Sequence, residues 1–406
     1  MLILIRLMRQ WLRISFVIFI ILNSAIASAR VTYSQLAVGG ANFNIAGALD
    51  SVASGTMNAA QTTLITAINS APNQQALNVD MQKLLPSINS AEKNIGALND
   101  GLSKVETRLA ALRNDESATY KTGFNAGDIS INSSMWIAPM GSITYQAAKG
   151  DNFGYKAKSI GFISGFDAMA DCANLVGVGF AMTGTRLTDF SNRNATTNTH
   201  RYHALLYGTR LLENNYSIDW LVTASYNKNK GQRLINISGS DLSVKSQYGT
   251  YNFALKVVQS KSFDFFESYR FTPLTSIQYG YAHQNPYSET GGAAFKFQGQ
   301  KKNIVTLGVG SKFNFPIDAW RVVGMRELRA VVTYDVLNAK NVTKANFVFG
   351  SDTFVLIDPP TRLALKVGAG FTFELAKQLQ LQFAYDFEMR HGFTDHTGLI
   401  KVKYVF

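Results

Sequence analysis

The sequence predicts an all-β transmembrane barrel of 12 antiparallel strands, with an N-terminal α-helical linker threaded through its lumen. Three observations favour this fold: side chains that alternate with period two, candidate strands of roughly 11–17 residues, and connections that alternate between long and short. Charged residues make up only 16% of the 406 residues, whereas aromatic residues reach 12%. Ordinary soluble proteins have about 25% charged residues, so this composition argues against a cytosolic enzyme.

The alternation is clearest in the segment Gln378 to Glu388. Its apolar residues are Leu379, Leu381, Phe383, Tyr385 and Phe387, and those between them are polar, charged or small. Successive side chains of a strand point to opposite faces, so one face is apolar and the other polar. Strands of soluble proteins average about 5–6 residues, whereas the segments here are long enough to cross a bilayer at a tilt.

Twelve such segments can be assigned, and the number is even, as in single-chain bacterial barrels. They cover residues 134–147, 154–170, 174–189, 198–213, 216–229, 243–258, 264–283, 302–315, 326–338, 361–376, 378–391 and 396–406. Connections after even-numbered segments are mostly short, and those after odd-numbered segments are mostly long, as at Asp189–Thr197, Lys230–Leu242, Gln284–Lys301 and Ala339–Pro360. This asymmetry is typical of an outer-membrane barrel.

Residues 1–29 form the predicted signal peptide. Arg6, Arg9 and Arg13 give a basic start before an apolar core over Ile14–Leu22, and Ala27-Ser28-Ala29 provides a small-residue cleavage site before Arg30. A retained membrane anchor is the alternative. Cleavage lowers the formal net charge from +12 to +9. No mature segment approaches the roughly 18 apolar residues of a membrane helix, which excludes a helical membrane protein.

Two helical segments are expected between the signal peptide and the strands. Residues 30–89 form a short segment with helices over Ala53–Ile68 and Asn73–Leu85, and residues 90–120 form the linker. The linker helix, over 90–113, has an apolar stripe at Ile95, Leu98, Leu102, Val105, Leu109 and Leu112. Its length of about 36 Å matches about 30 Å of hydrocarbon. Because its other face is polar, we expect it inside the barrel; a short coiled coil or a periplasmic helix is the alternative.

Charged side chains on the polar strand faces are predicted to face the lumen, because a Lys or Arg in lipid near the midplane costs about 2–4 kcal/mol. These residues are Asp219, Lys256, Lys312, Arg362, Lys366, Glu374, Asp386 and Glu388. They either line a water-filled pore or pair with the linker, whose charges include Asp100, Lys104, Glu106 and Arg108. Inward glycines are expected to make room for the helix, namely Gly308, Gly310, Gly368 and Gly370.

Catalytic, cofactor and metal sites are not expected. Residues 30–199 contain no histidine, which disfavours nucleophilic catalysis with a histidine base there. His200 and His203 are three apart on a predicted strand, hence on opposite faces, and make a poor metal pair. Cys172, the single cysteine, is expected to be a turn thiol without a catalytic base beside it. We therefore expect neither an enzyme nor a cofactor.

Over roughly residues 90–406 the sequence resembles the classical monomeric autotransporters of type V secretion. The resemblance includes Met135-Trp136, Gly141-Ser142, Gly154-Tyr155 and Gly165-Phe166-Asp167. The linker, with Leu84-Leu85-Pro86 before it, resembles the surface-antigen branch of obligate intracellular bacteria. The resemblance implies that residues 121–406 are the β-barrel domain and residues 30–89 a short passenger remnant. It also implies an outer-membrane translocator and anchor that exports or displays its own N-terminal segment at the cell surface; an outer-membrane surface antigen or pore without a functional passenger is the alternative.

The last predicted strand resembles the signal that the barrel-assembly machinery reads, with its apolar face at Ile400, Val402, Tyr404 and Phe406. The expected partners are therefore this machinery, periplasmic chaperones, outer-membrane lipid and lipopolysaccharide. A host surface ligand is a further candidate partner. Basic residues suited to lipopolysaccharide phosphates are Arg193, Arg201, Lys228, Lys230, Lys301 and Lys302. Nucleic-acid binding is rejected, because the positive charge occurs together with the strand pattern of a membrane barrel. We expect a monomer.

The threaded linker can be tested by crosslinking. In a Cys172→Ser background, cysteines introduced as Ala110→Cys and Gln382→Cys should form an intrachain crosslink if the helix lies in the lumen. A gel of the mature protein under oxidising conditions measures this. Efficient interchain crosslinking through cysteines at Leu102 or Leu109, with none to the barrel, would establish the coiled coil instead.

Overall fold

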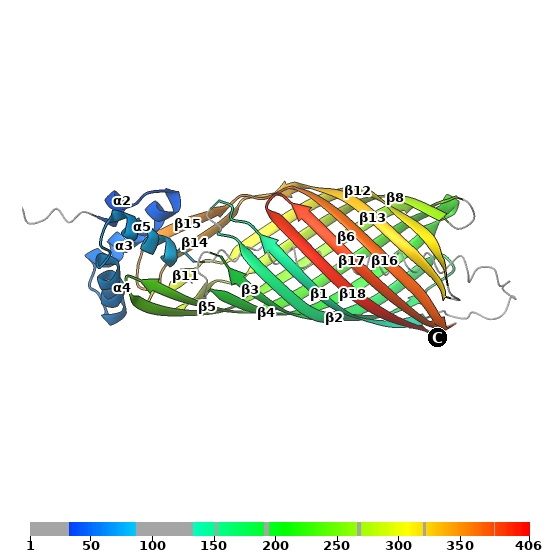
Figure 1. Cartoon of the computed structure of the whole chain (residues 1–406), viewed down its shortest axis with the longest axis horizontal. Helices are drawn as coiled ribbons and strands as arrows, with labels where there is room; N and C mark the ends of the chain where they lie inside the picture. Colours follow the sequence, from blue (N-terminus) through cyan, green and yellow to red (C-terminus); the bar gives the residue numbers. More distant parts are fainter. Residues whose placement is uncertain are drawn as a thin grey trace, which may run out of the picture.

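The computed structural model describes residues 32–86, 133–150, 153–190, 195–265, 269–319, 322–376 and 378–406. Twelve long strands form a closed antiparallel barrel, and helices cover one of its ends (Figure 1). The predicted barrel, including its strand number, is confirmed. The predicted signal peptide and the linker helix over 90–113 lie outside the described residues, so threading through the lumen stays a prediction.

The barrel strands follow one another around the wall in chain order. They are β1 (Ser133–Gln146), β2 (Tyr155–Met169), β3 (Asn174–Asp189), β4 (Thr196–Leu212), β5 (Tyr216–Ile237), β6 (Ser240–Lys261), β8 (Tyr269–Gln284), β12 (Gln300–Ala319), β13 (Val322–Asn338), β16 (Leu363–Ala376), β17 (Leu379–Arg390) and β18 (Phe393–Val405). Closure comes from β1 and β18, which pair from Ser134 opposite Val405 to Gln146 opposite Phe393. A closed barrel leaves no strand edge unpaired in lipid.

The two faces of each strand divide as the alternation predicts. On β5 the inward side chains of Asp219, Thr223 and Asn227 are buried, whereas Tyr226 is exposed on the outer face. On β17 the outward Phe383 and Tyr385 are exposed, whereas Gln382 on the opposite face is buried. Apolar side chains therefore face the lipid and polar ones the lumen, the pattern of an outer-membrane barrel.

Three segments expected to be long loops contain strands. Lys230–Leu242 is wrong as a loop, because β5 and β6 continue as a hairpin to a turn at Ser238 and Gly239. The other two contribute β9 (Tyr287–Ser288), β10 (Thr290–Gly291), β11 (Phe295–Phe297), β14 (Asn341–Phe347) and β15 (Thr353–Asp358). A separate four-stranded sheet runs in the order β15-β14-β11-β9. Period two continues through these segments, since Arg233, Ile235 and Ile237 are all buried on one face.

Within residues 32–86 the structure has four helices, α2 (Tyr33–Leu36), α3 (Gly40–Ser54), α4 (Ala59–Asn69) and α5 (Gln74–Leu84). The expected helix over Ala53–Ile68 is wrong at its start, because α3 ends at Ser54 and α4 begins after Asn58. The Asn58 side chain accepts a hydrogen bond from the Gln61 N–H, which caps α4 and favours a new helix there. The helix expected over Asn73–Leu85 is confirmed as α5. None of the helices in the described part of the chain has the length and apolar character needed to span a bilayer.

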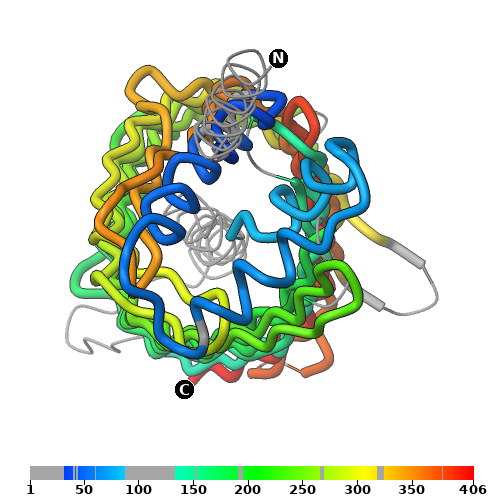
Figure 2. Tube along the Cα trace, turned by 90° about the vertical axis from the view of Figure 1, so that its left-hand side faces the viewer, coloured from blue at the N-terminus to red at the C-terminus, as the bar shows by residue number. Residues whose placement is uncertain are grey.

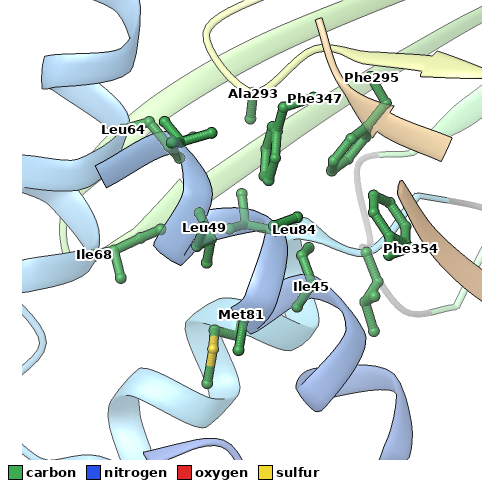
Figure 3. Close-up of a cluster of buried hydrophobic side chains, with 14 of the residues drawn as sticks. Ile45, Leu49, Leu64, Ile68, Met81, Leu84, Ala293, Phe295, Phe347 and Phe354 are labelled. Carbon is green, nitrogen blue, oxygen red and sulfur yellow. The ribbon is translucent and has the colours of Figure 1, made fainter. Parts of the chain in front are cut away.

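The helices form a cap over the rim of the barrel mouth (Figure 2). We use "cap" for residues 32–86. The cap and the extended hairpins share one apolar core, in which Ile45, Leu49 and Leu84 pack in the same cluster as Phe295 and Phe347 (Figure 3). All five side chains are fully buried. Fully burying an apolar side chain contributes about 1.5–3 kcal/mol, so this shared core holds the cap on the mouth.

Removing one ring from the shared core should loosen the cap without unfolding the barrel. Phe347→Ala leaves a cavity that costs about 3–5 kcal/mol, whereas Val348→Ala alters a neighbouring exposed side chain and serves as the matched control. Limited proteolysis should then cut Phe347→Ala within residues 32–86 at least tenfold faster than the control, because a lower stability of the cap raises the population of its opened state. Equal rates for the two variants would show that this core does not hold the cap.

Candidate functional site: the lumen and the capped mouth

The lumen contains a cavity that is lined by side chains of β5, β6, β8, β12, β13, β16, β17 and β18. Six of the eight residues predicted to face it lie on this lining, namely Asp219, Lys256, Lys312, Lys366, Asp386 and Glu388. The other two, Arg362 and Glu374, are exposed near the two ends of β16. Arg329 and Asp395 also lie on the lining. Acidic and basic residues are present there in equal number, so the cavity does not carry a strong field of one sign.

Arg329 on β13 links its own strand to β17 on the lumen wall. Its Nε donates to Asp386 Oδ1 at 3.0 Å, and its Nη1 lies 2.9 Å from Glu327 Oε1. The side chains of Arg329 and Asp386 are only 11% and 19% exposed. Water screens such partly buried pairs weakly, so this contact joins β13 to β17 across the intervening strand β16. Arg329 was not among the residues predicted to face the lumen, because only the strand register aligns it in one row with Gly368 and Asp386.

A second network links Lys366, Glu388, Arg390 and Asp335. Lys366 Nζ lies 3.0 Å from Glu388 Oε2, and Arg390 contacts Glu388 at 2.7 Å and Asp335 at 3.0 Å. These contacts arise because Lys366 stands directly opposite Glu388 in the β16–β17 register. The sequence left open whether Lys366, Asp386 and Glu388 line a pore or pair with the linker. Each of them has a charged partner on the barrel wall.

Gly368 makes room for the first of these networks. It lies between Arg329 and Asp386, and a Cβ added there would stand 2.5 Å from both Arg329 Nε and Asp386 Oδ1. At Gly370 the nearest atom would be 3.7 Å from the added Cβ, an ordinary contact. The space over Gly368, which was expected to accommodate a helix, is therefore used by an ion pair of the wall.

A buried, hydrogen-bonded aromatic cluster lies on the inner face of the wall near the end where the last strand finishes. Trp136 Nε1 donates to Tyr207 Oη at 2.8 Å, and Tyr207 Oη donates to Asp167 Oδ2 at 2.9 Å. All three residues are buried. A Cβ at Gly165 would be 2.7 Å from the Trp136 ring, so this glycine lets the ring lie flat against the wall. Inward aromatic residues were not predicted, since the sequence places most aromatics on the outer face.

At the mouth, Arg233 and Glu289 anchor the cap. Arg233 Nη2 lies 2.5 Å from Glu289 Oε2, and Arg233 Nη1 donates to the carbonyl of Leu84 at 3.1 Å. Burial raises the pKa of the Glu289 carboxyl, and the neighbouring Arg233 guanidinium opposes that rise. Two cap side chains also donate to hairpin carbonyls: Asn44 to Val355 at 3.0 Å and Gln61 to Phe349 at 3.1 Å. The cap is therefore held by directed polar contacts as well as by its apolar core.

The residues named as an assembly signal lie together on the outer face of the last strand. The side chains of Ile400, Val402, Tyr404 and Phe406 are all exposed. The Tyr404 and Phe406 rings meet edge to face at 5.1 Å, and the Phe406 N–H donates to the Ser133 carbonyl at 3.0 Å. Lys401 and Lys403 are buried on the opposite face.

Two of the basic residues expected to meet lipopolysaccharide point inward. Arg201 donates to Thr185 Oγ1 on the lumen face, and the buried Lys302 donates to the carbonyl of Ala339 at 3.0 Å and to Asn341 Oδ1 at 2.7 Å. The expectation is wrong for these two, because neighbouring residues on a strand face opposite sides. Lys228, Lys230 and Lys301 are exposed on the outer face, and Arg193 lies outside the described residues.

His200 is exposed and His203 buried, on opposite faces as expected.

The spacing role of Gly368 can be tested by two matched substitutions. Gly368→Ala should force Arg329 away from Asp386 and cost about 2–3 kcal/mol, whereas Gly370→Ala should have little effect. The temperature at which the folded gel band converts to the unfolded band measures this difference. If both variants convert at the same temperature, the ion pair does not depend on the missing Cβ.

Comparison with known proteins agrees with this architecture. The autotransporter beta-domain family matches residues 135–386. Outer membrane protein B of Rickettsia japonica is 23% identical over 384 residues, which cover 86% of this chain and 22% of that protein. The Rickettsia typhi protein of the same name is 25% identical over 319 residues, covering 73% of this chain and 19% of its own length. The chain thus spans about a fifth of the length of these relatives.

Solved structures show the same fold. The translocator domain of the autotransporter NalP from Neisseria meningitidis aligns with a TM-score of 0.56 at 12% identity, covering 76% of this chain and 98% of that domain. The β domain of the Bordetella autotransporter BrkA aligns with a TM-score of 0.50 at 13% identity, covering 68% of this chain and all of that domain. The barrel is therefore one of the bacterial outer membrane, and the chain belongs to the autotransporter β-domain family.

Proposed function

We propose that this chain carries its own N-terminal segment across the outer membrane and keeps that segment as a helical cap on the cell surface. One observation supports the proposal most directly: the cap and the start of β1 lie at opposite ends of the barrel (Figure 1). In this proposal Leu84 at the end of α5 and Ser133 at the start of β1 lie on opposite sides of the membrane.

Hydrogen bonds at the two ends of the barrel support the positions of the cap and of the start of β1. Leu84 accepts a hydrogen bond from Arg233 in the extended β5–β6 hairpin. Ser133 accepts one from Phe406, at the opposite end of the barrel from the helices. The capped end carries the long hairpins, and long connections in such barrels face outward. Residues 32–86 would then be outside the cell while Ser133 is at the periplasmic end.

The fit of the cap supports retention rather than release. A segment exported only to be released has no need for a core shared with the barrel. Here Leu64, Ile68 and Met81 of the cap are fully buried in the same cluster as hairpin residues. Arg233 and Glu289, with side chains 7% and 6% exposed, are paired at this contact. Removing either partner would leave the other charge buried, which is costly.

The lumen and the last strand have supporting roles in this proposal. The charged lining keeps the route through the barrel polar, as transport of a hydrophilic segment requires. We further propose that Ile400, Val402, Tyr404 and Phe406 present the last strand to the assembly machinery. A host ligand of the cap would meet its outer surface, where Val38 and Val79 are exposed.

Cysteine labelling of intact cells tests the orientation. Val79→Cys in a Cys172→Ser background should react with a membrane-impermeant maleimide before the cells are permeabilised. The natural chain supplies the matched control, because Cys172 is exposed in the β2–β3 turn at the opposite end and should react only after permeabilisation. The reverse pattern, with Cys172 labelled on intact cells and Val79→Cys protected, would place the cap in the periplasm and overturn the proposal.

A further inference from the structure

The outer face of β2 to β5 has a sharp boundary between apolar and basic side chains. On β3 the outward residues Val176, Val178, Phe180 and Met182 are all exposed. The next two outward positions toward the capped end are Gly184 and Arg186. Exposed apolar side chains on the outer face of such a barrel face the acyl chains of lipid, so Arg186 stands at the upper edge of the lipid-facing band.

Aromatic residues mark the same edge on the neighbouring strands. Tyr202 on β4 and Tyr226 on β5 are exposed, stand directly opposite each other, and are followed outward by His200 and Lys228. Tyrosines form belts at both interfaces of membrane barrels, at the level of the headgroups. The basic residues just beyond them therefore lie at the level of the lipid phosphates.

The strand register arranges these residues in two adjacent rows. One row is Lys158, Arg186, Asn198 and Lys230, and the other is Ile160, Gly184, His200 and Lys228. We call Lys158, Arg186, His200, Lys228 and Lys230 the basic margin. All five side chains are exposed. Within the described residues, no ion pair joins any of them to a carboxylate.

The pairing of Lys158 with Arg186 is unfavourable in the protein alone. The two residues stand directly opposite each other on β2 and β3, where Cβ atoms are about 4.5–5.5 Å apart and like charges destabilise a sheet. An anion shared by both cations would remove this repulsion. Phosphate suits the site, because Arg binds it with two parallel hydrogen bonds and Lys adds a compact charge.

We propose that the basic margin binds the phosphate groups of a phosphorylated glycolipid in the outer leaflet, of the lipopolysaccharide class. The acyl chains of this lipid lie along the apolar band below the margin, beside Ile160 and Val178. Its phosphates bridge Lys158 and Arg186, with Lys228 and Lys230 two strands away. The assignment to the outer leaflet rests on the orientation given under the proposed function.

Binding of bisphosphorylated lipopolysaccharide to the purified full-length protein in detergent tests the site. The double variant Lys158→Gln/Arg186→Gln should bind it about tenfold or more weakly than the natural chain. Its folded gel band should persist, because the substitutions also remove a repulsion. The matched control is Arg210→Gln/Lys261→Gln, which removes two charges at the opposite end of the same strand face and should bind like the natural chain. Dephosphorylated lipopolysaccharide should bind all three proteins equally weakly.

Several results would overturn the proposal. Equal binding of the phosphorylated and dephosphorylated lipids by the natural chain would exclude phosphate recognition, and unchanged binding by Lys158→Gln/Arg186→Gln would exclude these residues. Full competition by inorganic phosphate at concentrations similar to those of the lipid would indicate a site for free phosphate instead. None of these results depends on which end of the barrel faces outward, so they are distinct from failure of the labelling experiment.

Discussion

Closure of the sheet by β1 and β18 is the constraint on which the rest of the structure depends. A strand edge cannot remain unpaired in hydrocarbon, because each unsatisfied backbone group there costs several kcal/mol. Once the wall is closed, every residue faces either lipid or lumen, and the period of two decides which. The exposed aromatics, the buried Asn and Thr side chains and the inward charges on β5 and β17 all follow from this single geometric condition.

Polar side chains inside such a wall need partners, and the register supplies them. Lys366 meets Glu388 because the two are directly opposed, and Arg329 reaches Asp386 because Gly368 between them has no side chain. The Trp136–Tyr207–Asp167 cluster uses the same device, with a small residue beneath a large one. The lumen is thus a connected set of cross-strand contacts, which ties non-neighbouring strands together and stiffens the wall.

The sequence predicts the strands better than it predicts what joins them. Alternation is a local property, so all twelve barrel strands were located, although β5 extends to Ile237, eight residues beyond its predicted end. The long hairpins were missed beyond Asn229 because polar residues such as Lys230 and Gln232 suggested a loop. On the other face, Ile235 and Ile237 are apolar because they are buried in the same cluster as cap residues, a contact that the local sequence does not reveal. Inward and outward assignments failed at Arg201 and Lys302, where a shift of one residue reverses the face. The Arg329–Asp386 contact depends on residues 57 positions apart and has no local signature.

The shared core of the cap has a consequence for the direction of movement. Its cap residues come from positions 33–85, but its hairpin residues come from positions 235–356, later in the chain. The core is therefore complete only when both parts are on the same side of the membrane. On the route proposed here, burial of the cap against the hairpins makes backward sliding unfavourable, so the fold acts as a thermodynamic ratchet for translocation. The free energy for this step would come from the burial of the cap residues against the hairpins.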